Sequence, residues 1–342
     1  MLQKYVNNTG VPLSVAVYLA TDHYDFVPGA ISATALMKSI RQQVLPRRIP
    51  RNSADSQTEL LSVVKSRIGT SIHDGIERAW TGGHYKVAME ELGYPQHIID
   101  RVVVNPGHIQ HPTKGWVKGA GEQQLPENPI PVYMELRSFK ELDGFTISGK
   151  FDLVAQGRLE DFKSTGTFTW VNNTKEEDYR IQGSIYRWLN PDIITQDHMA
   201  IQFFFTDWMP GRAKADPTYP QRITEQLLIP LMSLEETEDY IRSRLQLFSE
   251  HMDSKETELP FCTDKELWRR APEFKYYKNP AKTARSTKNF DNLGDANQRQ
   301  RDDGGVGIVV TVPGQAVACK YCAAFSVCTQ KDQLIASGSL IL

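Results

Sequence analysis

The sequence of 342 residues has little of several features that identify whole classes of protein. No apolar run approaches the 18 residues of a membrane span, so no transmembrane helix is predicted. The short apolar stretch at residues 11–20 lacks a basic segment before it and is followed by acidic residues, which argues against a signal peptide. Only four cysteines occur, and without a secretory signal they are not expected to form disulfides. We therefore expect a cytoplasmic protein without a membrane association.

The net charge of −2 excludes a uniformly basic nucleic-acid-binding protein, but basic residues gather locally. One cluster comprises Lys38, Arg41, Arg47, Arg48 and Arg51. A second comprises Arg269, Arg270, Lys275, Lys278, Lys282, Arg285 and Lys288. Either cluster alone is compatible with ordinary solvated surface. The presence of two such clusters favours phosphate contact, with Arg269, Arg270 and Lys275 as the candidates for binding DNA.

Hydrophobic periodicity predicts helices around a small mixed sheet, which is an α/β class. Helices are expected at 31–45, with Ser32 or Thr34 as N-cap, within 57–93, and at 176–189 and 233–252, the last capped by Ser233. The expected buried stripe of the second region is Leu60, Val64, Ile68, Ile72 and Ile76. Strands are expected at 132–139, 145–155, 158–165, 199–208, 221–228 and 308–312. A long loop is expected at 104–131, and irregular chain after Pro260 with a mobile polar linker at 291–307.

The sharpest local signal is the segment GKFDLVAQGRLEDFKST, read as a hairpin. Strand side chains alternate between faces, so Asp152 shares a face with Lys150, and Asp161 shares one with Lys163. If Gln156 and Gly157 form a two-residue turn, Asp152 lies opposite Asp161. Two facing carboxylates repel each other unless a divalent cation lies between them, and oxygen ligands suit Mg²⁺ or Mn²⁺. The alternative is a solvated acidic hairpin without catalytic function.

Two further patterns involve helices. His73 lies one turn after Gly69, which would allow close backbone approach, although a lone histidine here is also compatible with a core residue. Gln182 and Tyr186 are spaced i and i+4 and so share one helical face, although a buried Gln–Tyr pair is also compatible with capping a core.

The order G-x-x-x-H, G-x-x-D, D-x-K, Q-x-x-x-Y resembles the motif series of the RecB-like branch of PD-(D/E)XK nucleases. The resemblance spans residues 31–330 and looks closest to phage-encoded exonucleases. It implies a restriction-endonuclease-like core, a small mixed β-sheet flanked by helices, and in-line hydrolysis of a DNA phosphodiester. It implies His73, Asp152, Asp161 and the Phe162 carbonyl as metal ligands, and Lys163 as catalytic lysine. Gln182 and Tyr186 would position the lysine or the DNA strand, and Glu135 is a further candidate that could instead pair with Arg137 or Arg180.

The cysteines form a separate pattern. Cys319, Cys322 and Cys328 are spaced C-x₂-C-x₅-C, and Cys262 is the remaining cysteine. Four thiolates can hold zinc or a [4Fe–4S] cluster. Three clustered cysteines with a remote fourth resemble the iron–sulfur RecB-like nucleases, so we expect a [4Fe–4S] cluster, with zinc or free thiols as alternatives. In several of those relatives the fourth cysteine precedes the nuclease core, whereas Cys262 follows it.

These patterns predict three regions: an N-terminal helical segment at 1–56, the nuclease core at 57–256 and the cysteine region at 257–342. The expected function is a metal-dependent exonuclease acting on single-stranded DNA or duplex ends, with recombination or replication proteins as partners. Two alternatives remain: a DNA-end-binding module of weak activity, and a trimming nuclease of CRISPR adaptation. The sequence does not indicate an oligomeric state.

Overall fold

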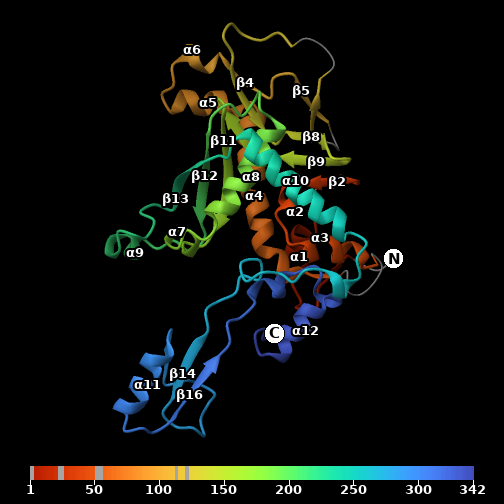
Figure 1. Ribbon diagram of the computed structural model, residues 1–342. Coiled ribbons are helices and arrows are strands. Elements are labelled where there is room, and N and C mark those ends of the chain that lie inside the picture. Colours follow the sequence, from red (N-terminus) through yellow and green to blue (C-terminus); the bar gives the residue numbers. More distant parts are fainter. Residues whose placement is uncertain (1–3, 22–26, 51–56, 112–114, 120–122) are drawn as a thin grey trace. The chain divides into compact units, whose positions relative to one another are not determined.

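The computed structural model of the chain (Figure 1) describes residues 4–21, 27–50, 57–111, 115–119 and 123–342. Arg51, predicted in the first basic cluster, lies outside them. The described residues form two compact units. The larger contains residues 4–37 and 57–245, and the smaller contains 38–50 and 246–342. This division differs from the predicted regions, because residues 38–50 belong with the C-terminal part of the chain.

A six-stranded mixed sheet forms the centre of the larger unit, in the order β13-β12-β11-β10-β7-β4. Its strands are β4 (Val102–Val104), β7 (Ile130–Met134), β10 (Leu153–Ala155), β11 (Arg158–Thr165), β12 (His198–Phe205) and β13 (Thr224–Pro230). The pairs β11–β12 and β4–β7 are parallel and the others antiparallel. Helices flank this sheet, so the predicted α/β class is confirmed.

Two helices contact the central sheet and carry predicted site residues. Helix α4 (Val64–Thr81) contacts β11, and α8 (Glu176–Leu189) contacts β12 and β13. The bounds of α8 match the prediction, and its apolar face buries Ile185 and Trp188. Gly183 permits this close packing, because a Cβ there would lie 2.2 Å from the Met199 sulfur. Among the described helices, none has both the length and the apolar character of a membrane span.

A second sheet has three strands in the order β2-β9-β8. Along the chain, β8 follows β7 of the central sheet and β9 precedes β10. It contains β2 (Ala30–Ser32), β8 (Arg137–Leu142) and β9 (Phe145–Lys150). The strands predicted at 132–139 and 145–155 are therefore each divided, the first into β7 and β8 and the second into β9 and β10. The divisions fall at Glu135–Leu136 and Phe151–Asp152, and they determine the geometry of the candidate site.

Several predictions about the first hundred residues are wrong in detail. The helix predicted at 31–45 is instead β2, α2 (Ala33–Leu36) and α3 (Ile40–Val44). Ser32 caps α2 as predicted. The Ser39 side chain accepts a hydrogen bond from the Gln42 N–H and caps α3, so a second helix begins there and the predicted single helix is interrupted. The predicted buried stripe is also wrong, since Ile68 is 43% exposed and Leu60 alone of its five members is buried.

The region predicted as a long loop contains regular structure. A hairpin lies within residues 104–131, formed by β5 (His108–His111) and β6 (Gly115–Lys118). The helix α5 (His84–Glu91) lies within 57–93, where helices are predicted. Residues 112–114 at the hairpin tip are outside the described chain. The few apolar residues in this segment concealed the hairpin from sequence periodicity.

The smaller unit contains a second three-stranded sheet and part of helix α10 (Leu234–His251), which Ser233 caps as predicted. The sheet order is β15-β14-β16, with β14 (Glu273–Tyr277), β15 (Lys288–Phe290) and β16 (Ile308–Val312), and the predicted strand at 308–312 is confirmed. The irregular linker predicted at 291–307 is wrong. Helix α11 (Leu293–Asp302) occupies most of it, capped by the Asn292 side chain and held by buried Ala296.

Candidate metal centre

The hairpin that carries the acidic pattern has the predicted register. Gln156 and Gly157 have φ angles of 50° and 78°, so both turn residues adopt the left-handed conformation of a tight two-residue turn. Leu153 pairs with Glu160, and Ala155 with Arg158. Continuing this register by one residue places Asp152 opposite Asp161, just beyond the end of the ladder.

Asp152 faces a second carboxylate on its other side. Met134 pairs with Leu153, and Arg137 pairs with Lys150, so the two strands keep one register across their shared division. Glu135 therefore falls opposite Asp152, and its N–H donates to the Asp152 carbonyl oxygen at 3.0 Å. Glu135 adopts φ 51°, a conformation unusual for a residue with a side chain and common at functional sites. Three neighbouring strand segments thus each bring a carboxylate to one level.

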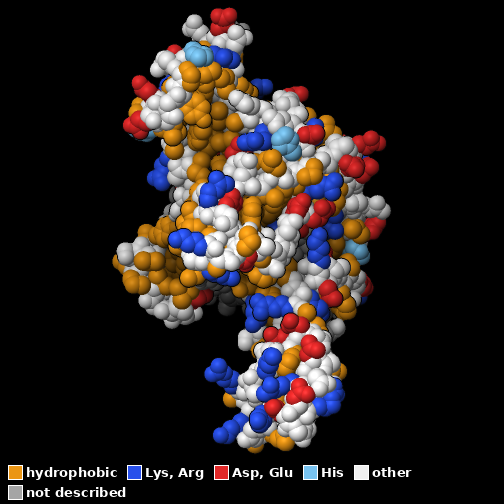
Figure 2. Space-filling model, turned by 90° about the vertical axis from the view of Figure 1, so that its left-hand side faces the viewer, with side chains coloured by type: hydrophobic (Ala, Val, Ile, Leu, Met, Phe, Trp, Pro, Cys, Tyr) orange, Lys and Arg blue, Asp and Glu red, His pale blue; other side chains and the backbone are white. Residues whose placement is uncertain are grey.

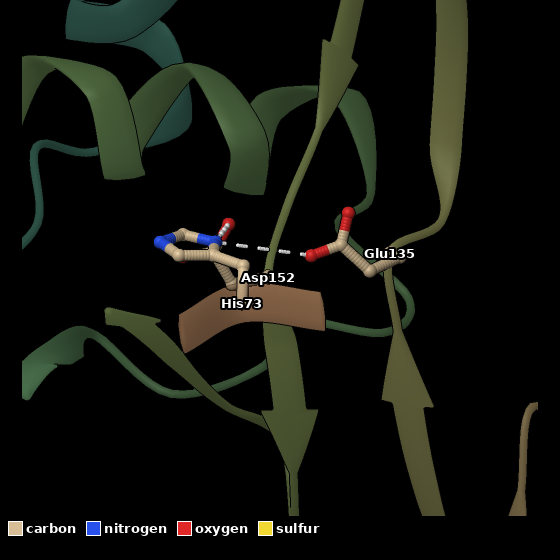
Figure 3. A group of neighbouring side chains, drawn as sticks. All are labelled: His73, Glu135 and Asp152. Atoms are coloured by element: carbon tan, nitrogen blue, oxygen red, sulfur yellow. Dashed lines mark ion pairs between the residues drawn. The ribbon is translucent and has the colours of Figure 1, made fainter. Parts of the chain in front are cut away.

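His73 on α4 approaches these carboxylates (Figure 3). Its Nδ1 lies 3.5 Å from Asp152 Oδ1 and 4.0 Å from Glu135 Oε1. One ligand atom from each of these three residues lies within 4.8 Å of the others. Gly69 lies close to β11, because a Cβ there would lie 3.0 Å from Ser164 Oγ.

The peptide group of Phe162 joins two of the site residues. Its N–H donates to Asp152 Oδ2 at 2.8 Å, and its carbonyl oxygen lies 2.9 Å from His73 Nε2. This contact orients the imidazole so that Nδ1 faces the carboxylates. Histidine ligands are commonly held through the second nitrogen in this way. The metal-ligand role that the resemblance implies for the carbonyl stays a prediction.

Asp161 and Lys163 form a pair within the same hairpin. Asp161 is 1% exposed, and its Oδ2 lies 2.5 Å from Lys163 Nζ. The Asp161 carboxylate therefore contacts Lys163, whereas Glu135 lies with His73 and Asp152 in the group of three possible metal ligands. Glu135, which sequence reasoning ranked lowest, thus belongs to this group, with its Oε1 at 4.0 Å from His73 Nδ1.

The pKa values show how strongly negative this centre is. Burial raises the pKa of Glu135 to about 7 against the charge of Lys150, whose Nζ lies 2.5 Å from Oε2. Burial likewise raises the pKa of Asp161 to about 6, with Lys163 opposing the shift and Asp152 adding to it. Burial disfavours the His73 imidazolium, but Asp152 and the other carboxylates outweigh it and raise its pKa to about 9. The unbalanced negative charge therefore draws in a proton, and a cation would have the same attraction.

Asp152 and Lys163 keep their charged forms. Burial opposes ionisation of Asp152, but the hydrogen bond and charge of His73, with Lys163 and the Phe162 N–H, lower its pKa. Burial would lower the pKa of Lys163, but Asp161 and Asp152 hold it above its ordinary value. The lysine is therefore a hydrogen-bond donor at neutral pH.

Helix α8 lies along the other side of Lys163. Gln182 Nε2 donates to Tyr186 Oη at 2.9 Å, and burial together with the charges of Asp161 and Asp152 raises the pKa of Tyr186. Sequence reasoning missed Tyr179, whose ring centre lies 5.7 Å from Lys163 Nζ. Its spacing of three residues before Gln182 would have placed it on the same helical face.

The four cysteines line one pocket in the smaller unit, with Leu267, Ala318 and Ala324 among its apolar walls. The Cys262 thiol donates to Ser39 Oγ at 3.2 Å, and Arg41 Nη1 donates to Cys328 Sγ at 3.5 Å. Burial and the neighbouring thiols raise the pKa of Cys319 to about 11. Among the described residues, no three cysteine sulfurs lie within 4.8 Å of one another.

The basic clusters are partly used within the protein. Arg41, predicted for phosphate contact, is 1% exposed and pairs with Glu256, so that prediction is wrong for this residue. Arg269 lies 2.5 Å from Asp264, and Lys275 lies 3.4 Å from Glu273. Arg270 is exposed. The DNA-binding role predicted for these residues stays a prediction.

Comparison with known proteins gives weak structural similarity and no sequence match. No protein-family model matches the chain, and no curated protein sequence matches it. The crystal structure of SSO0001 superposes with a TM-score of 0.37 and 12% identity, covering 69% of this chain and 87% of that one. A phage-related exonuclease from Haemophilus somnus 129PT gives a TM-score of 0.28 and 14% identity, covering 68% of this chain and 96% of that one. These scores are too low to assign function, so the function must come from the site.

Proposed function

We propose that the chain is a Mg²⁺- or Mn²⁺-dependent deoxyribonuclease of the PD-(D/E)XK superfamily, in its RecB-like branch, with a restriction-endonuclease-like core. It acts as an exonuclease on DNA in phage recombination, replication or repair. The observation that carries this proposal is that the register of neighbouring strands places the carboxylates of Glu135, Asp152 and Asp161 at one level of the sheet. His73 lies beside Glu135 and Asp152, and Lys163 contacts Asp161. A solvated acidic hairpin would not have Asp161 buried or Glu135 half-buried beside a histidine.

The donor set fits a divalent cation. Asp152, Glu135 and Asp161 offer carboxylate oxygens, and His73 Nδ1 offers a nitrogen, a combination that suits Mn²⁺ and, through the oxygens, Mg²⁺. Asp161 Oδ2 is buried, and its one partner among the described residues is Lys163 Nζ at 2.5 Å. When bound, such a cation polarises the phosphodiester and lowers the pKa of water.

The protein's own residues supply orientation and charge. Lys163 Nζ keeps its proton and can donate hydrogen bonds to the attacking water and to a phosphate oxygen in the transition state. The Tyr186 hydroxyl accepts a hydrogen bond from Gln182, which fixes its orientation. Because its pKa is raised, it stays protonated and remains a hydrogen-bond donor on the side of the site where Lys163 lies. His73 is held by the Phe162 carbonyl with Nδ1 directed at the carboxylates.

The proposal includes a [4Fe–4S] cluster at Cys262, Cys319, Cys322 and Cys328, with zinc as the alternative. The four cysteines line one shared pocket, which supports a single group held by all four. Arg41 Nη1 donates to the Cys328 sulfur, and hydrogen bonds of this kind to sulfur are typical of the surroundings of iron–sulfur clusters. The cluster would fasten residues 319–328 to residue 262 and so stabilise the smaller unit.

The test is digestion of 5′- and 3′-labelled single- and double-stranded DNA with Mg²⁺, Mn²⁺ or EDTA. We expect metal-dependent release of nucleotides from ends, and its loss in Asp152→Asn. The matched control is Asp197→Asn, because the Asp197 side chain is 89% exposed and lies outside the carboxylate group. Equal activity of Asp152→Asn and the control would contradict the assignment.

A further inference from the structure

A cavity of about 350 Å³ lies in the larger unit, at the C-terminal end of α4, the helix that carries His73. It is bounded by the end of α4, by α5 and β4, and by the β5–β6 hairpin. Its volume is within the range of small-ligand sites. Figure 2 views the molecule from the left-hand side of Figure 1, and hydrophobic side chains gather in its upper part, at the height of α5 and β4 in Figure 1.

Aromatic rings form the cavity's walls. Trp80 and Tyr85 are stacked, with ring centres 5.7 Å apart and planes 22° from parallel. Both pack against the core cluster beneath the sheet, so they form a fixed platform. Trp116 on β6 supplies a third ring, and its Nε1 donates to Glu77 Oε1 at 3.2 Å. Packing against the core cluster is enough to explain why Trp80 and Tyr85 lie here. It does not explain why the half-buried ring of Trp116 also lines the open cavity.

One helical face connects the cavity to the metal centre. His73, Glu77 and Trp80 are separated by four and three residues along α4, so they lie on one side of it. Seven residues correspond to about 10 Å along a helix axis, or about three stacked base steps. Glu77 lies between His73 and Trp80 on this face, and its Oε1 accepts a hydrogen bond from Trp116 Nε1.

We infer that this cavity holds an unpaired nucleobase of the substrate strand, about three nucleotides from the scissile phosphate, and so selects single-stranded DNA ends. The inference rests on the proposed nuclease function. Nucleobases of any sequence stack on aromatic rings, which suits an enzyme that removes successive nucleotides. The amides of Gln123 and Gln124 line the cavity and offer hydrogen bonds to a base edge. Lys86 is exposed at its edge and suits a phosphate oxygen.

The test uses short single-stranded DNA with 2-aminopurine at each of the first six positions from either end, because stacking quenches the fluorescence of this base. Binding is measured in Ca²⁺, and cleavage in Mn²⁺. We expect position-dependent quenching in the wild-type protein. Trp116→Ala should abolish it and raise the Kd for single-stranded DNA about tenfold, while binding of blunt duplex changes little. Trp116→Phe, which keeps a ring, should retain most of the quenching.

Tyr94→Ala is the matched control, since Tyr94 is 51% exposed and outside the cavity. Thermal melting reports whether Trp116→Ala keeps its fold, and Lys86→Gln, an exposed change, tests the same cavity without removing a ring. If the protein digests DNA but neither Trp116→Ala nor Lys86→Gln alters quenching or the single-strand preference, the base-binding inference is overturned and the nuclease proposal stands. If the wild-type protein quenches 2-aminopurine through Trp116 but cleaves no DNA with either metal, the nuclease proposal fails and the base-binding site remains.

Discussion

Glu135 and Asp152 lie opposite each other where two paired strands divide, and the Glu135 N–H donates to the Asp152 carbonyl at 3.0 Å. The backbone thus places two carboxyl groups side by side before any metal is considered. With Asp161 on the next strand and His73 above them, this arrangement costs electrostatic energy in the metal-free protein. The predictions below follow from that cost and from the cation that would remove it.

Replacing Glu135 should separate activity from stability. Glu135→Gln keeps the side-chain volume but removes one of three neighbouring charges, so the metal-free protein should melt at a higher temperature, by a few degrees. Mn²⁺ affinity and cleavage should fall at least about tenfold. Calorimetric melting with EDTA and Mn²⁺ titration check both effects. A lower metal-free melting temperature with undiminished metal affinity would show that Glu135 pairs only with Lys150.

Lys163 should act in the chemical step. Lys163→Met should reduce kcat at least about a hundredfold, as expected when a transition-state hydrogen-bond donor is lost, while DNA and Mn²⁺ still bind. Lys163→Arg, which preserves the charge, should recover part of the rate. Single-turnover cleavage and binding in Ca²⁺ separate the two effects. If Lys163→Met instead raises KM and leaves kcat unchanged, the lysine binds substrate rather than assisting the reaction.

Metal affinity and metal-free stability should respond to pH in opposite directions. A bound cation requires deprotonated ligands, so Mn²⁺ affinity should rise as pH passes 7, the pKa of Glu135, and continue rising towards 9, the pKa of His73. In the metal-free protein both pKa values are raised above their unfolded values. Their stabilising contribution is therefore complete below those unfolded values and is lost as pH rises through 7 and 9. Melting temperatures in EDTA and Mn²⁺ titrations from pH 6 to 9 test this, and His73→Gln should flatten the upper part of both curves.

The cysteine pocket should contain iron. Protein purified without oxygen should be brown and absorb broadly near about 400 nm, and Cys→Ser changes at any of the four positions should remove the colour and lower the melting temperature. Elemental analysis decides between metals, since one zinc per chain without iron would establish a zinc site. Loss at three positions with Cys262→Ser unaffected would require another fourth ligand.

Arg270 should carry more of any phosphate contact than its neighbours. Arg269 and Lys275 have acidic partners, whereas Arg270 is exposed. Arg270→Gln should therefore reduce the slope of log affinity against log salt by about one unit, since one released counterion is lost. Binding isotherms from 50 to 200 mM salt measure the slope. An unchanged slope would place this arginine on ordinary surface.

Local chemistry explains which parts of the structure could be predicted. The Gln156–Gly157 turn, the hairpin register, helix α8 and the Ser233 cap depend on neighbouring residues, and all are confirmed. The divided strands could not be predicted, because they depend on pairing with β2 and β7, which are distant in sequence. For the same reason the sequence left open whether Glu135 joins the site, and its ion pair with Lys150 was missed. Helix α11 was missed because its polar sequence shows little periodicity, and one cap and one buried alanine define it.

The most direct measurement follows Mn²⁺ binding by electron paramagnetic resonance and nucleotide release from end-labelled DNA in the same samples, as Mn²⁺ is added. The three-carboxylate centre predicts that binding and cleavage rise together in the wild-type protein and in Asp197→Asn. Both should be lost or shifted to much higher Mn²⁺ in Asp152→Asn. Wild-type cleavage by Asp152→Asn at the same Mn²⁺ concentration would contradict a catalytic metal at this site.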